Sequence, residues 1–350
     1  MWAGAEQRFV ISPTDAVSLN LGAEGQLHPH IEQRGATELD GTYLDEGQDF
    51  AIGALYGSVD VRPLRAIKLS AGGRFDYYST FGGSFNPRLA LIVEPREGSN
   101  IKLIAAKAFK APSVYEQTYA FIGQRANPNL EPENIYSAEL ELSQRLDPNI
   151  VVTAAVYANY IADLISLDEA PTVPNAAAEV QFQNTNTPVG TLGGELEVRR
   201  DWRAGWMLAA TYSLQHSTYL ASEGIGALLL QERSPLLREV PNSPSHLASF
   251  KGAVPLLGPE LTLMQRLTFE GQRYDTEDDA ASPTPQTRTD AALSWDIVLS
   301  GKEQRYGLDY ALGVYNAFDS RAQNPVSDEF RQRSIPILGR SFLAAAGLTF

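Results

Sequence analysis

Long stretches of this sequence alternate between apolar or small residues and polar residues at every second position. Between residues 67 and 77, the odd positions carry Ile, Leu, Ala, Gly, Phe and Tyr, and the even positions carry Lys, Ser, Gly, Arg and Asp. Residues 136–143, 261–270 and 290–300 largely repeat the pattern. A two-residue period places successive side chains on opposite faces of a β-strand, and helical spacing fits none of these segments. The chain is therefore predicted to be all-β.

The strands implied by this alternation are numerous and long. We expect about 15 strands of roughly 8 to 14 residues. Strands of soluble sandwiches average nearer 5 or 6 residues, whereas about 9 to 11 residues cross a bilayer when tilted. The lengths therefore favour a transmembrane barrel. The predicted strands centre near residues 9, 20, 54, 71, 90, 105, 140, 155, 196, 211, 250, 266, 294, 311 and 345.

Short and long connections alternate along the chain. Up-and-down membrane barrels have this arrangement, because periplasmic turns are tight and extracellular loops are long, whereas a propeller or solenoid would show a repeat period. We expect the last strand to run inward, so that the chain ends on the periplasmic side. The predicted short turns are Pro13–Asp15, Pro63–Arg65, Pro95–Ser99, Asp147–Asn149, Arg203–Gly205, Leu256–Gly258 and Gly301–Gln304. The predicted long segments are 25–48, 79–84, 110–133, 162–188, 217–244, 273–287 and 317–339.

Composition excludes several classes of protein. Hydrophobic residues make up 43% of the chain, but no apolar run approaches the ~18 residues of a spanning helix. The net charge of −14 opposes binding to nucleic acid, which requires a basic surface. The absence of cysteine removes disulfides and thiolate metal sites. Residues 1–8 do not have the basic and apolar regions of a signal peptide.

Several motifs resemble those of the TonB-dependent receptors of the Gram-negative outer membrane, and they occur in that family's order. The resemblance spans about residues 50 to 350. The residues that carry it are Asn86, Pro87 and Arg88; Phe109, Pro112 and Ser113; Asn127, Pro128, Pro132 and Glu133; Asn316, Phe318 and Asp319; and Gly339 and Arg340. The resemblance implies structural roles for these residues, in loops, on the lumen face and at the barrel seam.

Aromatic residues fit the same architecture. Trp202 and Trp206 flank one tight turn, where amphipathic rings would lie at the membrane–water boundary. The last strand carries Phe342, Leu348 and Phe350 on one face. The resemblance implies that the terminal Phe350 is a signal for the barrel-assembly machinery.

The sequence also departs from the family pattern. Members have a plug domain inside a 22-stranded barrel, and this sequence contains neither a plug nor the motif that contacts the energising protein. About 15 strands would leave two unpaired edges in lipid, which backbone hydrogen bonding does not tolerate. We therefore expect residues 1–350 to be part of a receptor barrel domain from an N-terminally truncated or misassigned chain, or else a truncated paralogue.

No constellation of catalytic or metal-binding residues stands out. His28 and His30 are two residues apart, but proline separates them in an expected loop and no pair of carboxylates accompanies them. Ser245 and His246 are adjacent, so on a strand they would point to opposite faces. The acidic run at 277–279 is typical of a solvated loop. We expect no catalytic residue, no metal site and no cofactor.

The favoured function is an outer-membrane receptor and transporter that takes up a scarce ligand, such as an iron–siderophore chelate. Ligand contacts are expected in the loops 110–133, 162–188 and 217–244. The resemblance implies four kinds of partner: membrane lipid, the barrel-assembly machinery, a small-molecule or metal-chelate ligand and, only if a plug is supplied, a TonB-type energising complex. A passive porin or channel, a barrel enzyme and a non-functional fragment remain as alternatives.

Overall fold

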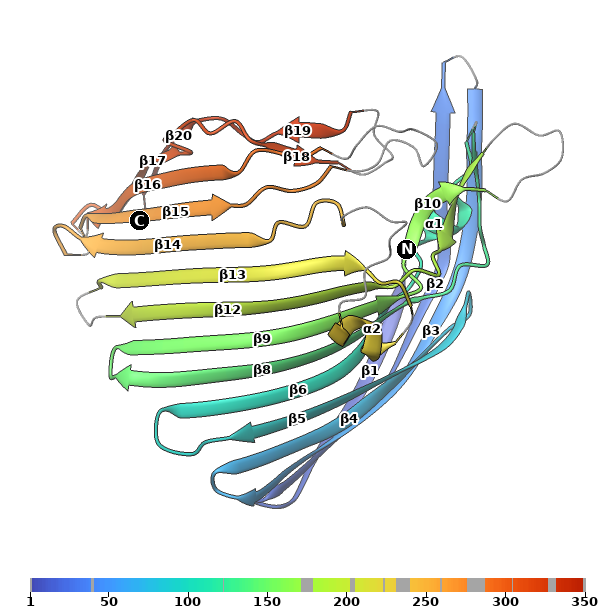
Figure 1. Ribbon diagram of the computed structural model, residues 1–350, viewed down its shortest axis with the longest axis horizontal. Helices are drawn as coiled ribbons and strands as arrows, with labels where there is room; N and C mark the ends of the chain where they lie inside the picture. Colours follow the sequence, from blue (N-terminus) through green and yellow to red (C-terminus); the bar gives the residue numbers. More distant parts are fainter. Residues whose placement is uncertain are drawn as a thin grey trace.

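A curved antiparallel sheet dominates the computed structural model of the chain (Figure 1). The structure describes residues 2–38, 41–121, 123–170, 179–201, 205–222, 224–230, 240–258, 260–275, 287–303, 305–326 and 332–348. In the part so described, no helix has the length and apolar character needed to cross a membrane. The predicted all-β class is confirmed.

Fifteen strands form this sheet, and every predicted strand centre falls inside one of them. Except for short strands in the connecting loops, neighbours in the sheet are neighbours in the sequence. The strands are β1 (Ala3–Thr14), β2 (Val17–Thr37), β3 (Gly41–Leu64), β4 (Ile67–Tyr78), β5 (Gly82–Val93), β6 (Ser99–Lys110), β8 (Glu133–Asp147), β9 (Ile150–Ala162), β12 (Val189–Asp201), β13 (Met207–Tyr219), β14 (His246–Pro255), β15 (Thr262–Glu270), β16 (Ala292–Glu303), β17 (Leu308–Tyr315) and β20 (Ser341–Leu348).

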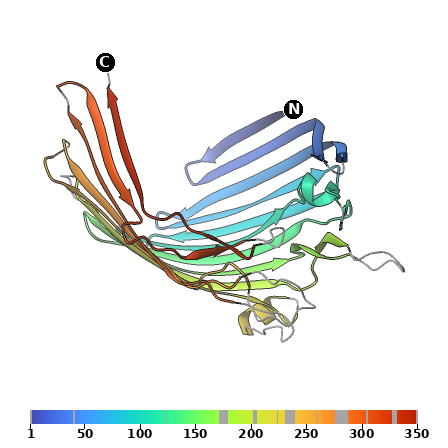
Figure 2. The same cartoon turned by 90° about the horizontal axis from the view of Figure 1, so that it is seen from above.

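The sheet is a trough with two free edges. Strands β1 and β20 stand at its two ends, and no pairing joins them within the described residues. Figure 2 shows the opening between the N-terminal and C-terminal strands. The strand count had predicted these two edges.

The two ends of the trough differ in the length of their connections. The described residues of the predicted short turns lie at one end, here called the turn end, and the longest connections lie at the opposite loop end (Figure 1). Leu348 of β20 pairs with Leu308, the first residue of β17, so the last strand runs toward the turn end. The predicted direction of the last strand is thus present. The predicted alternation of connections holds for much of the chain, but the expected long segment 79–84 is wrong, because β4 ends at Tyr78 and β5 begins at Gly82.

The concave face of the sheet is polar and the convex face is apolar. On β13, Ser213 and Gln215 line the concave face, whereas Leu214 between them is 46% exposed on the convex face. Residues directly opposite one another in an antiparallel ladder share a face, so this assignment passes from strand to strand. The outward rows include Phe9, Leu21, Leu55, Leu69, Phe85, Leu103, Leu140, Leu196, Phe250, Leu267, Leu293, Leu312 and Phe342, all at least 37% exposed.

The segment 25–48, predicted to be a loop, is instead the far part of a β-hairpin. Strands β2 and β3 pair from Val17 with Val61 to Thr37 with Gly41, with a register shift between His28 and Ile31. Pro29 lies in that irregularity, where the ladder does not need its missing N–H. Strand β4 starts to pair with β3 only at Ile52, so the hairpin extends about 35 Å past its neighbours, at 3.3 Å per residue.

The other long connections contain short elements that the alternation did not predict. They are α1 (Val114–Thr118), β7 (Gln124–Arg125), β10 (Ile165–Glu169), β11 (Val180–Asn184), α2 (Ile225–Leu230), β18 (Gln323–Pro325) and β19 (Ser334–Pro336).

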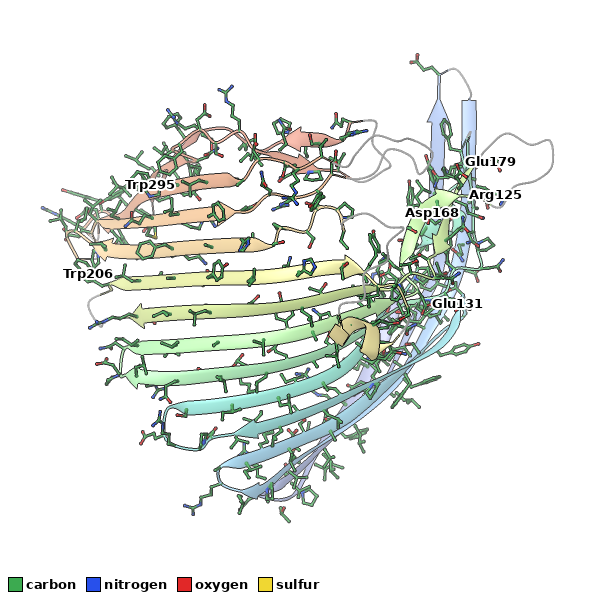
Figure 3. The ribbon with its side chains drawn as sticks, in the orientation of Figure 1. Arg125, Glu131, Asp168, Glu179, Trp206 and Trp295 are labelled. Atoms are coloured by element: carbon green, nitrogen blue, oxygen red, sulfur yellow. The ribbon has the colours of Figure 1, made fainter. Side chains whose placement is uncertain are left out.

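Several predictions concern residues outside the described ranges. These are the proposed assembly signal Phe350, the boundary residue Trp202, the acidic run at 277–279, and parts of the predicted turns Arg203–Gly205 and Gly301–Gln304. Trp206 is described: it lies at the turn end, 43% exposed (Figure 3), in agreement with a boundary position.

Candidate functional site

The concave wall of β8, β9, β12 and β13 is lined by acidic and hydroxyl-bearing side chains. A hollow of about 990 Å³ lies against this wall and extends to β14 and β15. Its lining includes no lysine or arginine but five glutamates: Glu139, Glu141, Glu195, Glu197 and Glu270. Lys102 contacts one of them, with Nζ 2.7 Å from Oε1 of Glu141. The wall therefore presents hydrogen-bond acceptors and negative charge to whatever occupies the interior.

A second part of the concave wall, on β2 to β4, holds an arginine between two carboxylates. The guanidinium of Arg74 donates to Glu24 at 2.8 Å and to Asp76 at 2.7 Å. It also lies 5.6 Å from the ring centre of Tyr56. Tyr56 lies flat over Gly22, where a Cβ atom would come within 2.1 Å of the ring. The ring can occupy this position only because its cross-strand neighbour has no side chain.

Two of the three candidate ligand loops fold together at the loop end. Within 110–133 and 162–188, β7 pairs in parallel with β11, and β11 pairs antiparallel with β10. Arg125 of the first loop pairs with Gln181, which pairs in turn with Asp168 of the second loop; Figure 3 labels Arg125 and Asp168 at the loop end. The name "loop body" is used below for α1, β7, β10 and β11 together. The alternation pattern could not reveal it, because its strands are short and pair across about 55 residues of sequence.

Helix α1 begins at the motif residue Ser113. The Ser113 hydroxyl accepts a hydrogen bond from the backbone N–H of Glu116, and the Glu116 carboxylate accepts one from the Ser113 N–H at 2.7 Å. This reciprocal arrangement is a capping box. Burial raises the pKa of the Glu116 carboxyl, but the hydrogen bonds from Ser113 and the contact with Lys110 outweigh it and hold the pKa below its usual value.

Lys110 joins the two ends of the first loop. Its Nζ lies 3.0 Å from Oε1 of Glu133 and 3.1 Å from Oε1 of Glu116. The side chain of Glu133 is 7% exposed, and its Oε1 also accepts the backbone N–H of Ile165 at 3.0 Å. Lys110 thus pairs with the motif residue Glu133 and with Glu116, the capping partner of the motif residue Ser113. Phe109 and Pro112 flank this junction in the sequence.

Asn127 ties the first loop to the second. Its Nδ2 donates to the carbonyl of Phe182 at 2.8 Å, and its Oδ1 accepts the N–H of Asn129. After Pro128, Leu130 is 1% exposed. Asn184 then accepts the N–H of Glu131 and donates to its carbonyl. The motif from Asn127 to Glu133, with Pro132 before its last residue, therefore works as the inner frame of the loop body.

The last two motif groups meet at one corner of the loop end. Asn316 and Asp319 adopt left-handed backbone conformations, with φ of 48° and 54°. Nδ2 of Asn316 donates to the carbonyls of Ser320 and Leu338, and Oδ1 of Asp319 accepts the N–H of Arg340 at 3.0 Å. This backbone hydrogen bond, together with Arg321, lowers the pKa of the Asp319 carboxyl.

Two further motif residues complete this corner. A Cβ at Gly339 would lie 3.1 Å from Oδ1 of Asp319, so glycine permits the close approach. The ring of Phe318 packs 5.7 Å from that of Trp295 on β16. The corner fixes the path of the chain as it leaves β17 and returns to β20.

The first motif group lies apart from the others, on β5. Asn86 pairs with Arg74, Pro87 with Gly73 and Arg88 with Gly72. Asn86 accepts a hydrogen bond from Ser84 at 3.4 Å on the concave face. These residues form part of the wall rather than part of the loop body.

The third candidate loop, 217–244, contributes α2. Leu220, Ala227 and Leu228 form a small buried cluster with Tyr160 of β9, and the Tyr160 hydroxyl accepts the N–H of Gly224 at 3.0 Å. The β2–β3 hairpin also reaches the loop body, since the hydroxyl of Thr118 in α1 donates to Gln33 at 3.3 Å. Sequence patterns did not indicate this last contact.

The two N-terminal histidines lie in strand β2, not in the loop that was expected. His28 stacks on Phe50 with ring centres 4.2 Å apart, and Nε2 of His30 lies 2.7 Å from Oε1 of Glu32. Among the described residues, no group of three or more histidine, aspartate and glutamate side chains is placed to hold a metal ion.

The chain is similar to a known protein family and to a curated relative. A family model described as "TonB dependent receptor-like, beta-barrel" matches residues 13–317. A curated relative, the iron-regulated outer membrane virulence protein of Vibrio cholerae serotype O1, is 23% identical over 236 residues, which cover 63% of this chain and 35% of the relative.

Solved structures share the fold. The FrpB iron transporter of Neisseria meningitidis superimposes with a TM-score of 0.74 at 14% identity, covering 99% of this chain and 54% of that one. The ferric-catecholate import receptor Fiu of Escherichia coli K12 gives 0.73 at 16% identity, with 100% and 54% covered. The chain thus spans about half the length of the structures it matches.

Proposed function

The chain belongs to the TonB-dependent receptor-like β-barrel family, and from this premise we propose that it forms the ligand-capturing wall of a receptor for a scarce ligand such as an iron–siderophore chelate. The family comprises outer-membrane receptors and transporters rather than enzymes. The chain is accordingly a multi-pass β-barrel protein of the outer membrane.

The observation that carries the proposal is the folded loop body above a polar interior wall. A loop that only connects two strands needs no sheet of its own. Here β7, β10 and β11 form such a sheet, and hydrogen bonds of Asn127, Asn184 and Glu133 hold it. The body also presents aromatic surface at Tyr115, which is 37% exposed. Its ring centre lies 4.6 Å from that of Tyr119 and 5.9 Å from that of the buried Phe182. Aromatic rings on a pre-ordered frame are suited to contact a small ligand without a large loss of entropy.

The proposed sequence of events begins with capture of the ligand by the loop body and by the loop 217–244. The ligand then meets the concave wall, whose hydroxyl, amide and carboxylate groups exchange hydrogen bonds with it. Onward movement requires a plug and a TonB-type energising complex, as partners beyond the described residues. The loop end would face the exterior and the turn end the periplasm.

The free edges of the sheet, at β1 and β20, need partners in a membrane. Unpaired N–H and C=O groups in lipid cost several kcal/mol each. We therefore propose that other strands pair with β1 and β20 in the membrane, so that residues 1–350 act as one part of a closed barrel domain. An in-frame extension upstream that encodes a plug and further strands would support this, and a stop codon there would contradict it.

Binding can be tested on the full chain folded in detergent. The probes are a ferric trihydroxamate, a ferric tricatecholate and their iron-free forms, with binding followed by calorimetry. We expect the wild type to bind at least one iron-loaded chelate saturably. In Y115A the affinity should fall about tenfold, or about 1.4 kcal/mol, which is the loss expected when one aromatic contact is removed. A matched control is Y306A, which removes an exposed tyrosine from the turn end.

Two outcomes would contradict the receptor function. No saturable binding of any chelate, or equal affinity for iron-loaded and iron-free forms in all variants, would show that the protein does not recognise an iron chelate as such. A steady open pore in planar bilayers, without chelate binding, would instead indicate a passive channel.

A further inference from the structure

A second hollow opens on the convex side of the sheet, at the loop end of β13, β14 and β15. It has a volume of about 510 Å³. Its polar lining consists mainly of His216, Ser243, Ser245, His246, Tyr274 and Arg288. This surface is separate from the concave wall and from the loop body described above.

Strand alternation establishes which side the hollow faces. Gln215, Leu247 and Glu270 line the concave hollow, and their sequence neighbours His216, His246 and Phe269 line the second hollow. Successive side chains of a strand point to opposite faces. The two histidines and Phe269 therefore project from the convex, lipid-facing side.

The second hollow lies where the apolar band ends. Along β13 the outward row reads Leu208, Ala210, Tyr212 and Leu214, and then changes to His216. Histidine and arginine are costly in the hydrocarbon but are tolerated at headgroup level. Tyr212, at the same boundary, holds His246 through its hydroxyl, 2.8 Å from Nδ1.

The charge of this hollow is opposite in kind to that of the concave wall. Among the described residues, its lining includes one arginine, two histidines and no carboxylate, whereas five glutamates line the concave hollow. The guanidinium of Arg288 lies 4.5 Å from the ring centre of Tyr274 and also donates a hydrogen bond to its hydroxyl. The arginine is therefore held in place by stacking while its other N–H groups remain available.

We propose that this hollow binds the phosphate group of a lipid headgroup. Arginine, histidine and tyrosine together offer a permanent positive charge and several donors, which suit the oxygens of a phosphate. The opening toward lipid, at the boundary of the apolar band, favours a headgroup over a free anion. A phosphate there would also be anchored by its own acyl chains on the apolar surface below.

The test uses the full chain folded in neutral detergent and native mass spectrometry with bis-phosphorylated lipid A. The variants are R288Q and the double variant H216Q with H246Q. R305Q is the matched control, because Arg305 also stacks on a tyrosine, 5.4 Å from the Tyr306 ring centre, but at the turn end. Dephosphorylated lipid A and millimolar inorganic phosphate are the matched ligands, and heat-modifiable mobility on gels confirms folding.

We expect the wild type and R305Q to retain the phosphorylated lipid. R288Q and the histidine double variant should bind it about tenfold more weakly, the loss expected for one charge-assisted hydrogen bond. Dephosphorylated lipid should bind all four proteins equally weakly. Equal retention by wild type and both hollow variants would overturn the proposal. Inorganic phosphate that bound as tightly as the lipid would overturn the assignment to a headgroup.

Discussion

The ammonium of Lys110 lies 3.0 Å from Oε1 of Glu133 and thereby joins the last residue of β6 to the first residue of β8. Everything between these two residues is the first loop, including α1 and β7. Glu133 additionally accepts the N–H of Ile165, at the start of β10 in the second loop. One carboxylate thus connects two loops and the barrel rim.

This connection predicts that Glu133→Gln loosens the loop body and leaves the sheet intact. The glutamine amide has no charge to pair with Lys110. Because residue 133 is nearly buried, the lost hydrogen bonding should destabilise the loop body by about 1–3 kcal/mol. We expect limited proteolysis within 111–132 to accelerate, with unchanged heat-modifiable mobility. Glu131→Gln, an exposed change two residues earlier, is the control. Identical cleavage rates for the two variants would contradict the prediction.

The corner formed by Asp319 and Arg340 should respond to pH. The backbone N–H of Arg340 and the guanidinium of Arg321 place the folded-state pKa of Asp319 below its ordinary value of about 3.9. The carboxylate therefore stabilises the corner above pH 4, and this stabilisation is lost as the pH falls through the folded-state pKa.

Hydrogen exchange of the Arg340 amide, corrected for intrinsic rates, measures this effect. Protection is expected to be constant from pH 7 to 5 and to decrease below about pH 4. In D319N the protection should be weaker and should no longer depend on pH. A wild-type amide equally protected at pH 3 and pH 6 would refute the role of the carboxylate.

A side chain at Gly22 should displace the ring of Tyr56. A Cβ there would come within 2.1 Å of the Tyr56 ring, so Gly22→Leu must displace a ring that neighbours Arg74. Such overpacking costs about 1–3 kcal/mol. A Cβ at Gly25 of the same strand would meet no atom within 4 Å, so Gly25→Leu is the matched control. Thermal unfolding in detergent should show a lower midpoint for G22L alone.

The assignment of faces can be tested on two adjacent residues of β13. Leu214 faces the convex side and Ser213 the concave side. A lysine on the lipid face costs up to about 2–4 kcal/mol, depending on depth. Leu214→Lys should therefore lower the yield of folding into vesicles, whereas Ser213→Lys should fold like the wild type. The opposite ranking would exchange the two faces.

Some elements of the fold follow from the sequence pattern and others do not. The two-residue period located all fifteen strands, because alternation is imposed locally by a sheet with one apolar and one polar face. The prediction was wrong for residues 25–48, which form a hairpin rather than a loop. Proline normally interrupts a strand, and the sequence does not show the bulge that accommodates Pro29. The motif residues could be named in advance. Only the structure shows that Glu116 and Glu133 share Lys110, or that Asn127 reaches Phe182.

The sequence by itself determined the strand centres, their faces and the family, and much of the alternation of turns and loops. These properties depend on neighbours a few residues apart. The tertiary structure alone decided the pairing of β7 with β11, the meeting of Asp319 with Arg340, and the hollow that brings His216 and His246 together with Arg288. These contacts join segments far apart in the chain, and their geometry follows from strand register and curvature, which no local pattern encodes.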